Sequence, residues 1–449
     1  MYRLLFQQFL RTRASQFGLI LILVLGGISI IIGKQFLINQ REEVDQAAKM
    51  QKEHLERNVE LHGDDLPLLL YYSSFTLLNE TNPLAGLSIG QKDLNPHVKR
   101  IGILAVEGQK YDSDLVNPTK LLFGNLDLSF VIVYLLPLLV IAFTYNLLSE
   151  EMESGTWYMV NVMAKSKLSY LIAKLSVRFL LLAVILLLLI AVGGTTLGIP
   201  WNTSFQLFIA TSLLYLIFWF VLSFWIACLK QNSNFNALTL LSIWLVLLVL
   251  LPAFINNQVT NKYPLPEALS LMIKQRDGYH TKWDTNKRKT MEAFYKDYPQ
   301  FEEYGFPPEQ GYNHPWYYAM QHLGDAESRE ESRAMLEKVQ MREASSRRWA
   351  QLVPTLHTQL VFNSLAGTGL TDYISFLEYT NEFHEKIKLI FYPHIFSGAT
   401  ADALDWEQFT PKTYTNIGKS FDRIKTLIPM ISSILLFVVL SAVSIRKVI

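Results

Sequence analysis

The chain is poor in charged residues and has almost no cysteine. Asp, Glu, Lys and Arg make up 18% of its 449 residues, below the share of about 25% that is usual in soluble domains. The formal net charge is +1, and no run of Lys and Arg makes a basic stripe, so nucleic acid is not an expected partner. Cys228 is the single cysteine, which excludes an intramolecular disulfide and a cysteine-based metal site.

The sequence also lacks the motifs of the common enzymes. It contains no G-x-x-x-x-G-K-[ST] phosphate loop, so we expect neither ATP hydrolysis nor a cofactor, such as ATP and Mg²⁺, in this chain. It offers no Ser/His/Asp set, paired carboxylates or nucleophile elbow, so we expect no catalytic residue. Metal handling is a weaker alternative, because no pair of histidines has the i, i+4 spacing of a helical metal site. The nine histidines all lie outside the long apolar runs: His54, His62, His97, His280, His314, His322, His357, His384 and His394.

Hydrophobic residues make up 50% of the chain and are concentrated in long runs. A hydrocarbon core of about 30 Å is crossed by about 20 helical residues. Two turn-forming glycines and a proline, Gly193, Gly198 and Pro200, divide the longest run into a helical hairpin. The sequence therefore predicts six transmembrane helices, at residues 17–37, 128–148, 176–198, 205–229, 235–256 and 426–445.

Basic residues in the short segments between these helices predict their orientation. Cytoplasmic flanks are enriched in Lys and Arg, and the turn between the third and fourth helices has none. We therefore expect both termini in the cytoplasm, with two insertions, residues 38–127 and 257–425, on the outer side. The basic flanking residues are Arg3, Arg11, Arg13, Lys165, Lys167, Lys174, Arg178, Lys230, Arg446 and Lys447.

The segments outside the six helices are expected to be mainly helical. Residues 1–16 predict an amphipathic helix that lies in the membrane interface with its apolar side in lipid, although the first span could simply begin early. In the insertions, the sequence predicts helices over Asn39–Leu61 and Ser328–Trp349 and a short strand near Ile101–Val106. A further helix is expected from an N-cap at Thr371–Asp372 toward Phe391, ended by Pro393. The expected fold class is an all-α integral membrane protein with a mainly helical (α+β) outer domain made from both insertions.

An aromatic cluster in the second insertion is expected to form the core of a small domain or to rest on the membrane surface. A groove for an amphipathic ligand is the less favoured alternative. The cluster comprises Tyr295, Tyr298, Phe301, Tyr304, Phe306, Tyr312, Trp316, Tyr317 and Tyr318.

Residues 149–175, between the second and third expected helices, are the best candidate for a functional site. Glu151 and Glu153 follow directly on a membrane helix, and Gly155 with Thr156 can break and restart a helix. Trp157 begins an apolar stretch, which with Met159, Val160 and Met163 predicts an amphipathic helix along the inner membrane surface. Such an element is suited to contact a cytoplasmic partner. The alternative is a solvated loop whose carboxylates only cap a helix.

At these residues the sequence resembles the permease subunits of ABC-2 type exporters, which carry an acidic-x-acidic-x-Gly-Thr pattern after the second span. Glu151, Glu153, Gly155 and Thr156 match it, and Lys167 and Lys174 stand where the family has basic residues. Met152 and Ala164 depart from its usual basic residue and proline. The two large insertions resemble a bacterial subgroup whose outer region has no assigned function.

This resemblance implies a multi-pass protein of the bacterial inner membrane with periplasmic insertions. It also implies a separate ATPase subunit, held at Glu151, Glu153, Gly155, Thr156 and Trp157, and a second permease subunit, identical or sister. The rival hypothesis is a membrane-anchored periplasmic receptor or scaffold without energy coupling. A membrane-embedded enzyme is least favoured, because the expected spans hold few polar residues.

Overall fold

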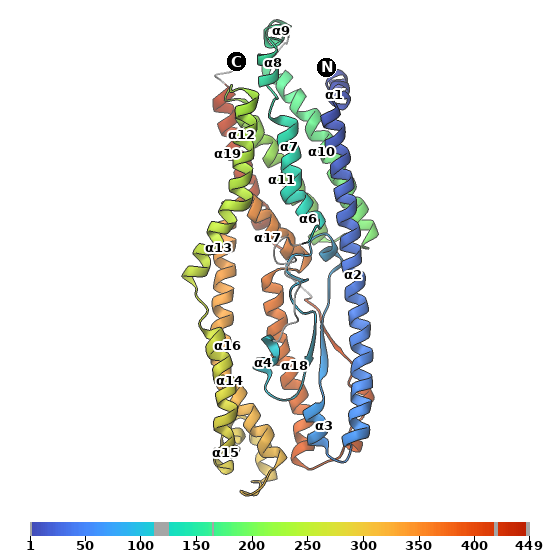
Figure 1. Cartoon of the computed structure of the whole chain (residues 1–449), viewed down its shortest axis with the longest axis vertical. Helices are drawn as coiled ribbons and strands as arrows, with labels where there is room; N and C mark the ends of the chain where they lie inside the picture. The colour runs from blue at the N-terminus through green and yellow to red at the C-terminus, as the bar shows by residue number, and fades with distance from the viewer. Residues whose placement is uncertain (1, 112–124, 164–165, 417–420, 446–449) are drawn as a thin grey trace.

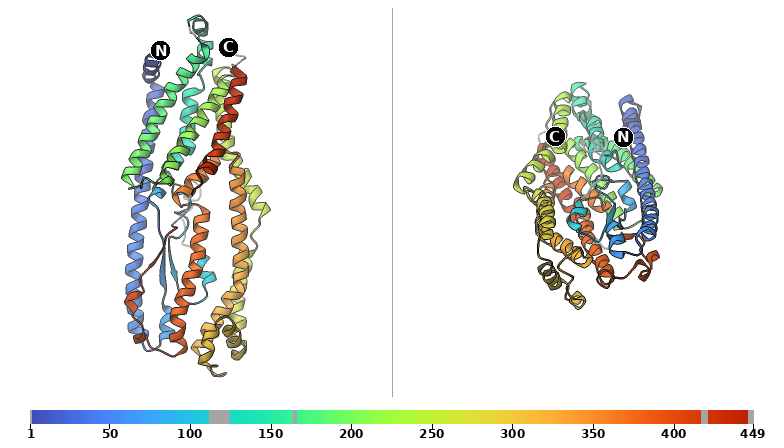
Figure 2. Two further views of the ribbon diagram at one scale, coloured as in Figure 1. Left: turned by 180° about the vertical axis from the view of Figure 1, so that it is seen from behind. Right: turned by 60° about the horizontal axis from the view of Figure 1, so that its bottom comes forward.

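A computed structural model of the chain describes residues 2–111, 125–163, 166–416 and 421–445 (Figure 1). Lys165, Arg446 and Lys447 among the basic flanks, and residues 112–124 of the first insertion, lie outside the described residues. The molecule is elongated, and α1, α9 and the end of α19 lie together at one end of its long axis (Figures 1 and 2). We call this the terminal end. The opposite end, with α3 and α15, belongs to the distal region, formed by residues 38–111 and 263–416.

Among the described residues, six helices are long and apolar enough to cross a membrane. This confirms a mostly helical chain and is compatible with a multi-pass membrane protein. Each expected span falls in one of these helices to within two residues. The second and fifth are assembled from several helical pieces. The six are α2 (Arg13–His62); α6 (Leu128–Phe130) with η2 (Val131–Leu135), α7 (Leu136–Thr144) and α8 (Ser149–Glu153); α10 (Lys167–Thr196); α11 (Thr203–Ala227); α12 (Ser233–Leu245) with η3 (Val246–Leu250) and α13 (Leu251–Lys262); and α19 (Arg423–Ile445).

A proline inside the second apolar helix shows how its backbone is satisfied away from water. Pro137 has no N–H and follows the π-helical stretch η2, so the regular α-helical hydrogen bonds are interrupted here. The Tyr215 hydroxyl of α11 donates to the carbonyl of Val133 at 2.8 Å. The Trp244 indole of α12 donates to the neighbouring carbonyl of Tyr134 at 3.1 Å. Side chains of two other spans therefore donate to backbone carbonyls at this interruption, as an apolar environment favours.

The N-terminal helix α1 (Tyr2–Arg11) packs part of its expected apolar side on protein, and its place in the membrane interface stays a prediction. Leu5 and Phe9 are buried. Leu5 lies against α10, and the ring of Phe9 meets Phe143 of α7 edge-on at 5.0 Å. Tyr2 and Phe6 remain exposed. The helix ends before Thr12, and α2 begins at Arg13 as a separate helix.

The distal region combines long helices with one small sheet. Helix α2 continues from its apolar part to His62, along one side of this region (Figure 1). Strand β1 pairs antiparallel with β2 and parallel with β3, with Leu77 opposite Lys412. The remaining elements are α3 (Leu66–Tyr72), β1 (Phe75–Asn79), η1 (Pro83–Gly86), β2 (Val98–Ile101), α4 (Val106–Tyr111), α14 (Glu267–Trp283), α15 (Lys287–Asp297), η4 (Pro299–Tyr304), α16 (His314–Ala350), α17 (Pro354–Ala366), α18 (Leu370–Phe396), η5 (Ala401–Ala403), η6 (Trp406–Gln408) and β3 (Lys412–Tyr414).

Three expectations for this region were wrong in detail. The strand lies at Val98–Ile101, and Val106 already belongs to α4. Helix α18 begins at Leu370 after Gly369, so the proposed Thr371–Asp372 cap lies inside its first turn. The helix also passes through Pro393, because a proline in the last turn removes a single backbone donor just before the helix ends.

The aromatic cluster forms the core of the distal region, as expected. Six of its nine members are buried there with residues of α3, α18 and the sheet: Tyr295, Tyr298, Phe301, Trp316, Tyr317 and Tyr318. The other three, Tyr304, Phe306 and Tyr312, are exposed at its rim. This core is separate from the apolar core of the six spans.

Candidate functional site

The α8–α9 segment, Ser149–Met163, forms the extreme of the terminal end. Helix α9 (Trp157–Met163) projects beyond α1 and the end of α19 (Figures 1 and 2). It lies beyond the ends of the spans and not along their sides, and its position along the inner membrane surface stays a prediction. Of the wider expected site, residues 149–175, the structure leaves only Ala164 and Lys165 undescribed.

A glycine turn joins α8 to α9. Gly155 has φ +75°, a conformation that side-chain-bearing residues rarely adopt. No atom lies within 4 Å of the position that a Cβ would take there. The glycine is therefore required for its backbone conformation and not for close packing. The turn places α9 at an angle that an uninterrupted helix could not reach.

Glu151 is held inside the protein by three donors. The Tyr170 hydroxyl and the Lys174 ammonium, both of α10, donate to Oε1 at 2.9 and 3.0 Å. The Thr156 hydroxyl, across the glycine turn, donates to Oε2. The side chains of Glu151 and Lys174 are only 14% and 7% exposed. Glu151 therefore fixes α8, the turn and α10 to one another.

Glu153 caps the first turn of α12, although the two lie 80 residues apart in the sequence. Its carboxylate accepts from the Ser233 backbone N–H at 2.7 Å and from the Ser233 hydroxyl at 2.9 Å. The Ser149 hydroxyl lies 2.7 Å from the same hydroxyl. A carboxylate at a helix N-terminus satisfies free N–H groups and suits the helix dipole. Glu153 thus ties α8 to the fifth apolar helix.

Trp157 and the rest of α9 point in different directions. Trp157 packs with a small apolar cluster that contains Leu148, Leu171, Cys228 and Ile445, so it anchors the helix to the bundle. The other large side chains of α9 form an exposed apolar surface, which we call the α9 face. Its members are 63–84% exposed: Tyr158, Met159, Val162 and Met163.

Sequence reasoning named the five candidate residues but missed most of their partners. Lys174 was noticed as a family-like basic residue. Tyr170 and Ser233 were missed, although Ser233 follows an Asn at the start of an apolar run and so stands where a helix N-terminus is predicted. The exposed members Tyr158 and Val162 were also missed, because a seven-residue helix gives too short a pattern to fix its buried face.

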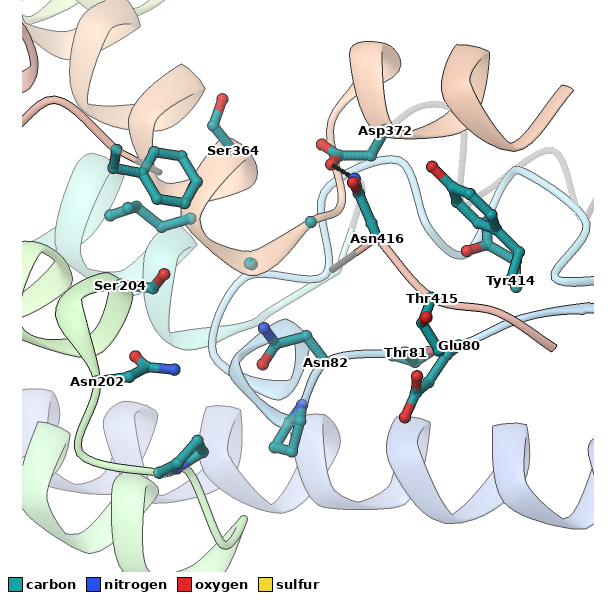
Figure 3. Close-up of a pocket in the computed structure, with 17 residues that line it drawn as sticks. Glu80, Thr81, Asn82, Asn202, Ser204, Ser364, Asp372, Tyr414, Thr415 and Asn416 are labelled. Atoms are coloured by element: carbon teal, nitrogen blue, oxygen red, sulfur yellow. Dashed lines mark hydrogen bonds between the residues drawn. The ribbon is translucent and has the colours of Figure 1, made fainter. Parts of the chain in front are cut away.

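A polar cavity of about 390 Å³ lies at the boundary between the spans and the distal region (Figure 3). The α10–α11 turn, the segment after β1, the α17–α18 turn and the segment after β3 all contribute to it. The Asn416 amide donates to Asp372 Oδ1 at 2.8 Å. The other labelled lining residues are Glu80, Thr81, Asn82, Asn202, Ser204, Ser364, Tyr414 and Thr415.

A buried polar group lies within the aromatic core of the distal region. The Lys388 ammonium contacts Glu385 Oε2 at 2.8 Å, donates to the Tyr298 hydroxyl at 2.9 Å and lies 3.3 Å from His322 Nδ1. Because an ammonium can only donate, Nδ1 accepts and the imidazole proton sits on Nε2. That nitrogen is 2.9 Å from Asp297.

Burial shifts the pKa values of this region in opposite directions for acids and bases. Burial, helped by the charge of Lys388, lowers the pKa of His322 to about 4 and that of His384 to about 3. Burial raises the pKa of Asp325 to about 6, although its carboxylate accepts the Glu107 N–H at 2.8 Å. These histidines are therefore neutral at pH 7. Among the described residues, no three His, Cys, Asp or Glu side chains are arranged to hold a metal ion.

Comparison with known proteins places one family model on the distal region. A model described as "Domain of unknown function (DUF3526)" matches residues 269–415, from within α14 to the segment after β3. No curated protein and no solved structure matches the chain. The match covers the aromatic core and the buried polar group but stops short of the α8–α9 segment.

Proposed function

We propose that the chain is the permease subunit of an ABC-2 type exporter of the bacterial inner membrane. In this proposal the terminal end is cytoplasmic, the distal region is periplasmic, and a separate ATP-binding-cassette subunit docks on the α9 face. The α9 face carries the proposal: Tyr158, Met159, Val162 and Met163 expose apolar side chains on the helix that extends furthest from the spans. Exposed apolar clusters of this kind mark sites of contact with a protein or a membrane, and we assign this one to the ATP-binding-cassette subunit.

The contacts of α8 give a route for motion from α9 into the membrane. Glu151 holds the segment to Lys174 of α10, and Glu153 holds it to Ser233 of α12. Helix α8 itself continues the second apolar helix. A displacement of α9 by the ATPase would therefore pull on the second, third and fifth spans together. Buried ion pairs and a doubly bonded carboxylate make these attachments stiff.

A second permease subunit, identical or sister, completes the proposed exporter. The fifth and sixth apolar helices are the least covered by the rest of the chain, since 17% of the most apolar stretch of each is buried, against 39–61% in the other four. In the proposed complex these surfaces face lipid and the second subunit. The substrate either crosses between the subunits or the distal regions perform mechanical work in the periplasm.

A periplasmic receptor or scaffold without energy coupling is the second candidate, and the polar cavity of Figure 3 favours it. Four separate segments supply hydroxyl, amide and carboxylate groups to one cavity of about 390 Å³, within the size range of small-molecule sites. A receptor would need this cavity but not the α9 face. The two candidates therefore make different predictions for variants of α9.

The test compares two methionine substitutions at similar exposure. Met159→Glu places a charge in the α9 face, whereas Met50→Glu does so on the distal part of α2; the parent side chains are 63% and 59% exposed. A charge buried against an apolar partner surface weakens binding at least tenfold. We expect Met159→Glu, but not Met50→Glu, to lose the co-purifying ATP-binding-cassette subunit and its ATP turnover. Equal retention by both variants would favour the receptor.

A further inference from the structure

A second cavity, of about 230 Å³, lies at the terminal end between α1, α7, α8 and α10. Its polar lining includes Gln8, Asn146 and Glu150, and its two cations are Lys174 and Arg178 of α10. Lys174 and Arg178 are only 6% and 8% exposed. Because they are four residues apart, they lie on the same face of α10, one turn from each other.

The two cations differ in how their charge is balanced. Lys174 lies 3.0 Å from Glu151 and 3.8 Å from Glu150, so both nearby carboxylates are directed to it. Arg178 has no carboxylate oxygen within 4 Å in the part of the chain that the structure describes. It donates to the carbonyl of Phe143, and its guanidinium lies 5.6 Å from the centre of the Phe9 ring.

Arg178 is thus a buried cation without a direct ion pair, and Glu150 and Glu151 act on it only from beyond ion-pair distance. A guanidinium carries five N–H donors in a planar fork, and among the described residues this one has an acceptor only in Phe143. A charge removed from water without a direct ion pair is costly to fold. The cavity beside Arg178 leaves room for an anion that completes its coordination.

We propose that this cavity binds a phosphate ester, the headgroup phosphate of an anionic phospholipid, against Arg178. The guanidinium fork matches phosphate oxygens in bidentate geometry. The volume of about 230 Å³ is smaller than a typical site for a drug-sized molecule, so it admits a headgroup while the acyl chains stay outside. The proposal requires a membrane but no particular partner protein.

The surroundings favour a lipid over a soluble phosphate. The cavity lies among the terminal-end parts of apolar helices, and its lining includes Leu5, Phe9 and Val177. Acyl chains can lie along the apolar helices while the phosphate stays at the depth of Arg178. Basic pockets between membrane helices bind anionic headgroups in this way.

The cavity also touches the candidate functional site, because Lys174 belongs to both. A bound phosphate would sit beside the residue that holds Glu151, and so beside the attachment of α8 to α10. We expect lipid occupancy to stiffen this attachment. The binding test below does not depend on that consequence.

The binding test is native mass spectrometry of the detergent-purified chain supplied with phosphatidylglycerol, phosphatidylcholine or glycerol 3-phosphate. We expect one phosphatidylglycerol to be retained in preference to phosphatidylcholine, with no retained glycerol 3-phosphate. Arg178→Gln should weaken this retention by fivefold or more, since one cation near a lipid surface contributes about that factor. Arg13→Gln, which removes an exposed cation at the same end, should leave the retention unchanged.

A paired substitution on α1 keeps the test decisive if Arg178→Gln folds poorly. Gln8 lines the cavity and Gln7 does not, and both are exposed. Gln8→Glu should reduce phosphatidylglycerol retention about fivefold, and Gln7→Glu should not. The proposal is overturned if Gln7→Glu and Gln8→Glu act equally, or if Arg178→Gln folds and retains the lipid. Retention of glycerol 3-phosphate as firmly as phosphatidylglycerol would overturn the lipid assignment.

Discussion

The glycine turn between α8 and α9 allows a prediction whose magnitude comes from backbone conformation alone. In Gly155→Val the new Cβ would meet no atom within 4 Å, so it causes no clash. Its only penalty is the positive φ of +75°. That conformation costs a residue with a side chain about 1–2 kcal/mol, and a β-branched residue lies at the upper end. Since 1.4 kcal/mol is a factor of ten, the native turn becomes about tenfold less favoured.

The consequence should be a misplaced α9 on an otherwise intact protein. Glu151 and Glu153 precede the turn, and their partners Lys174 and Ser233 belong to the spans α10 and α12, so neither hydrogen bond depends on the position of α9. Both hydrogen bonds should therefore survive in Gly155→Val. We expect normal membrane insertion and thermal stability, but a several-fold loss of ATP turnover in the complex with the co-purifying ATP-binding-cassette subunit.

A second glycine supplies the matched control. Gly198, in the α10–α11 turn, has φ +65° and also has no atom within 4 Å of a Cβ position. Gly198→Val thus introduces the same local strain far from α9. Gly155→Asn is a further control, because Asn tolerates this conformation. The reasoning is refuted if Gly155→Val and Gly198→Val change ATP turnover equally, or if Gly155→Asn is as harmful as Gly155→Val.

Two further predictions concern buried charges. Glu151→Gln leaves Lys174, which is 7% exposed, without its closest carboxylate. We expect this variant to lower the free energy of unfolding, measured by thermal unfolding, by about 2 kcal/mol. The double variant with Lys174→Met should recover part of the loss. The distal region should lose stability as the pH falls from about 6.5 toward 4, because His322 and His384, with pKa values lowered to about 4 and about 3, take up protons on unfolding. Asp325, with its pKa raised to about 6, has the opposite effect on stability, but it is a single group against two histidines. The unfolding temperature should therefore fall between pH 7 and pH 4.5, and His384→Gln should make this fall smaller. A rise of the unfolding temperature over the same range would show that Asp325 dominates.

Long apolar runs made the six membrane-length helices predictable, because a run of about 20 uncharged residues has few other structural solutions. The small sheet was not predictable. Strand β1 is buried on both faces, so Phe75–Asn79 shows none of the alternation that reveals a half-exposed strand. Its parallel partner β3 lies more than 300 positions later, with Leu77 opposite Lys412. No local pattern encodes a pairing of that separation.

The candidate site shows the same limit at shorter range. The sequence identified Glu153 from its neighbours, but its carboxylate contacts Ser233, 80 residues away on another apolar helix. The sequence does not predict the contact between Tyr170 of α10 and Glu151, because that contact depends on how the short helix α8 leaves the bundle. Trp157 is expected to take part in coupling to the ATPase, and this stays a prediction. Its packing against Leu148, Leu171 and Cys228, which anchors the start of α9, could not be predicted from the local sequence.

Site-specific photo-crosslinking from the α9 face tests the central claim most directly. A photoreactive residue would replace Val162, which is 84% exposed on α9, and separately Val184, which is 63% exposed on the apolar part of α10. After irradiation of native membranes, the linked peptides are identified by mass spectrometry. The account predicts that position 162 links to an ATP-binding-cassette chain, identified by its own phosphate-loop sequence, and that position 184 does not. Links from position 162 to lipid alone, or to no such chain, would contradict it.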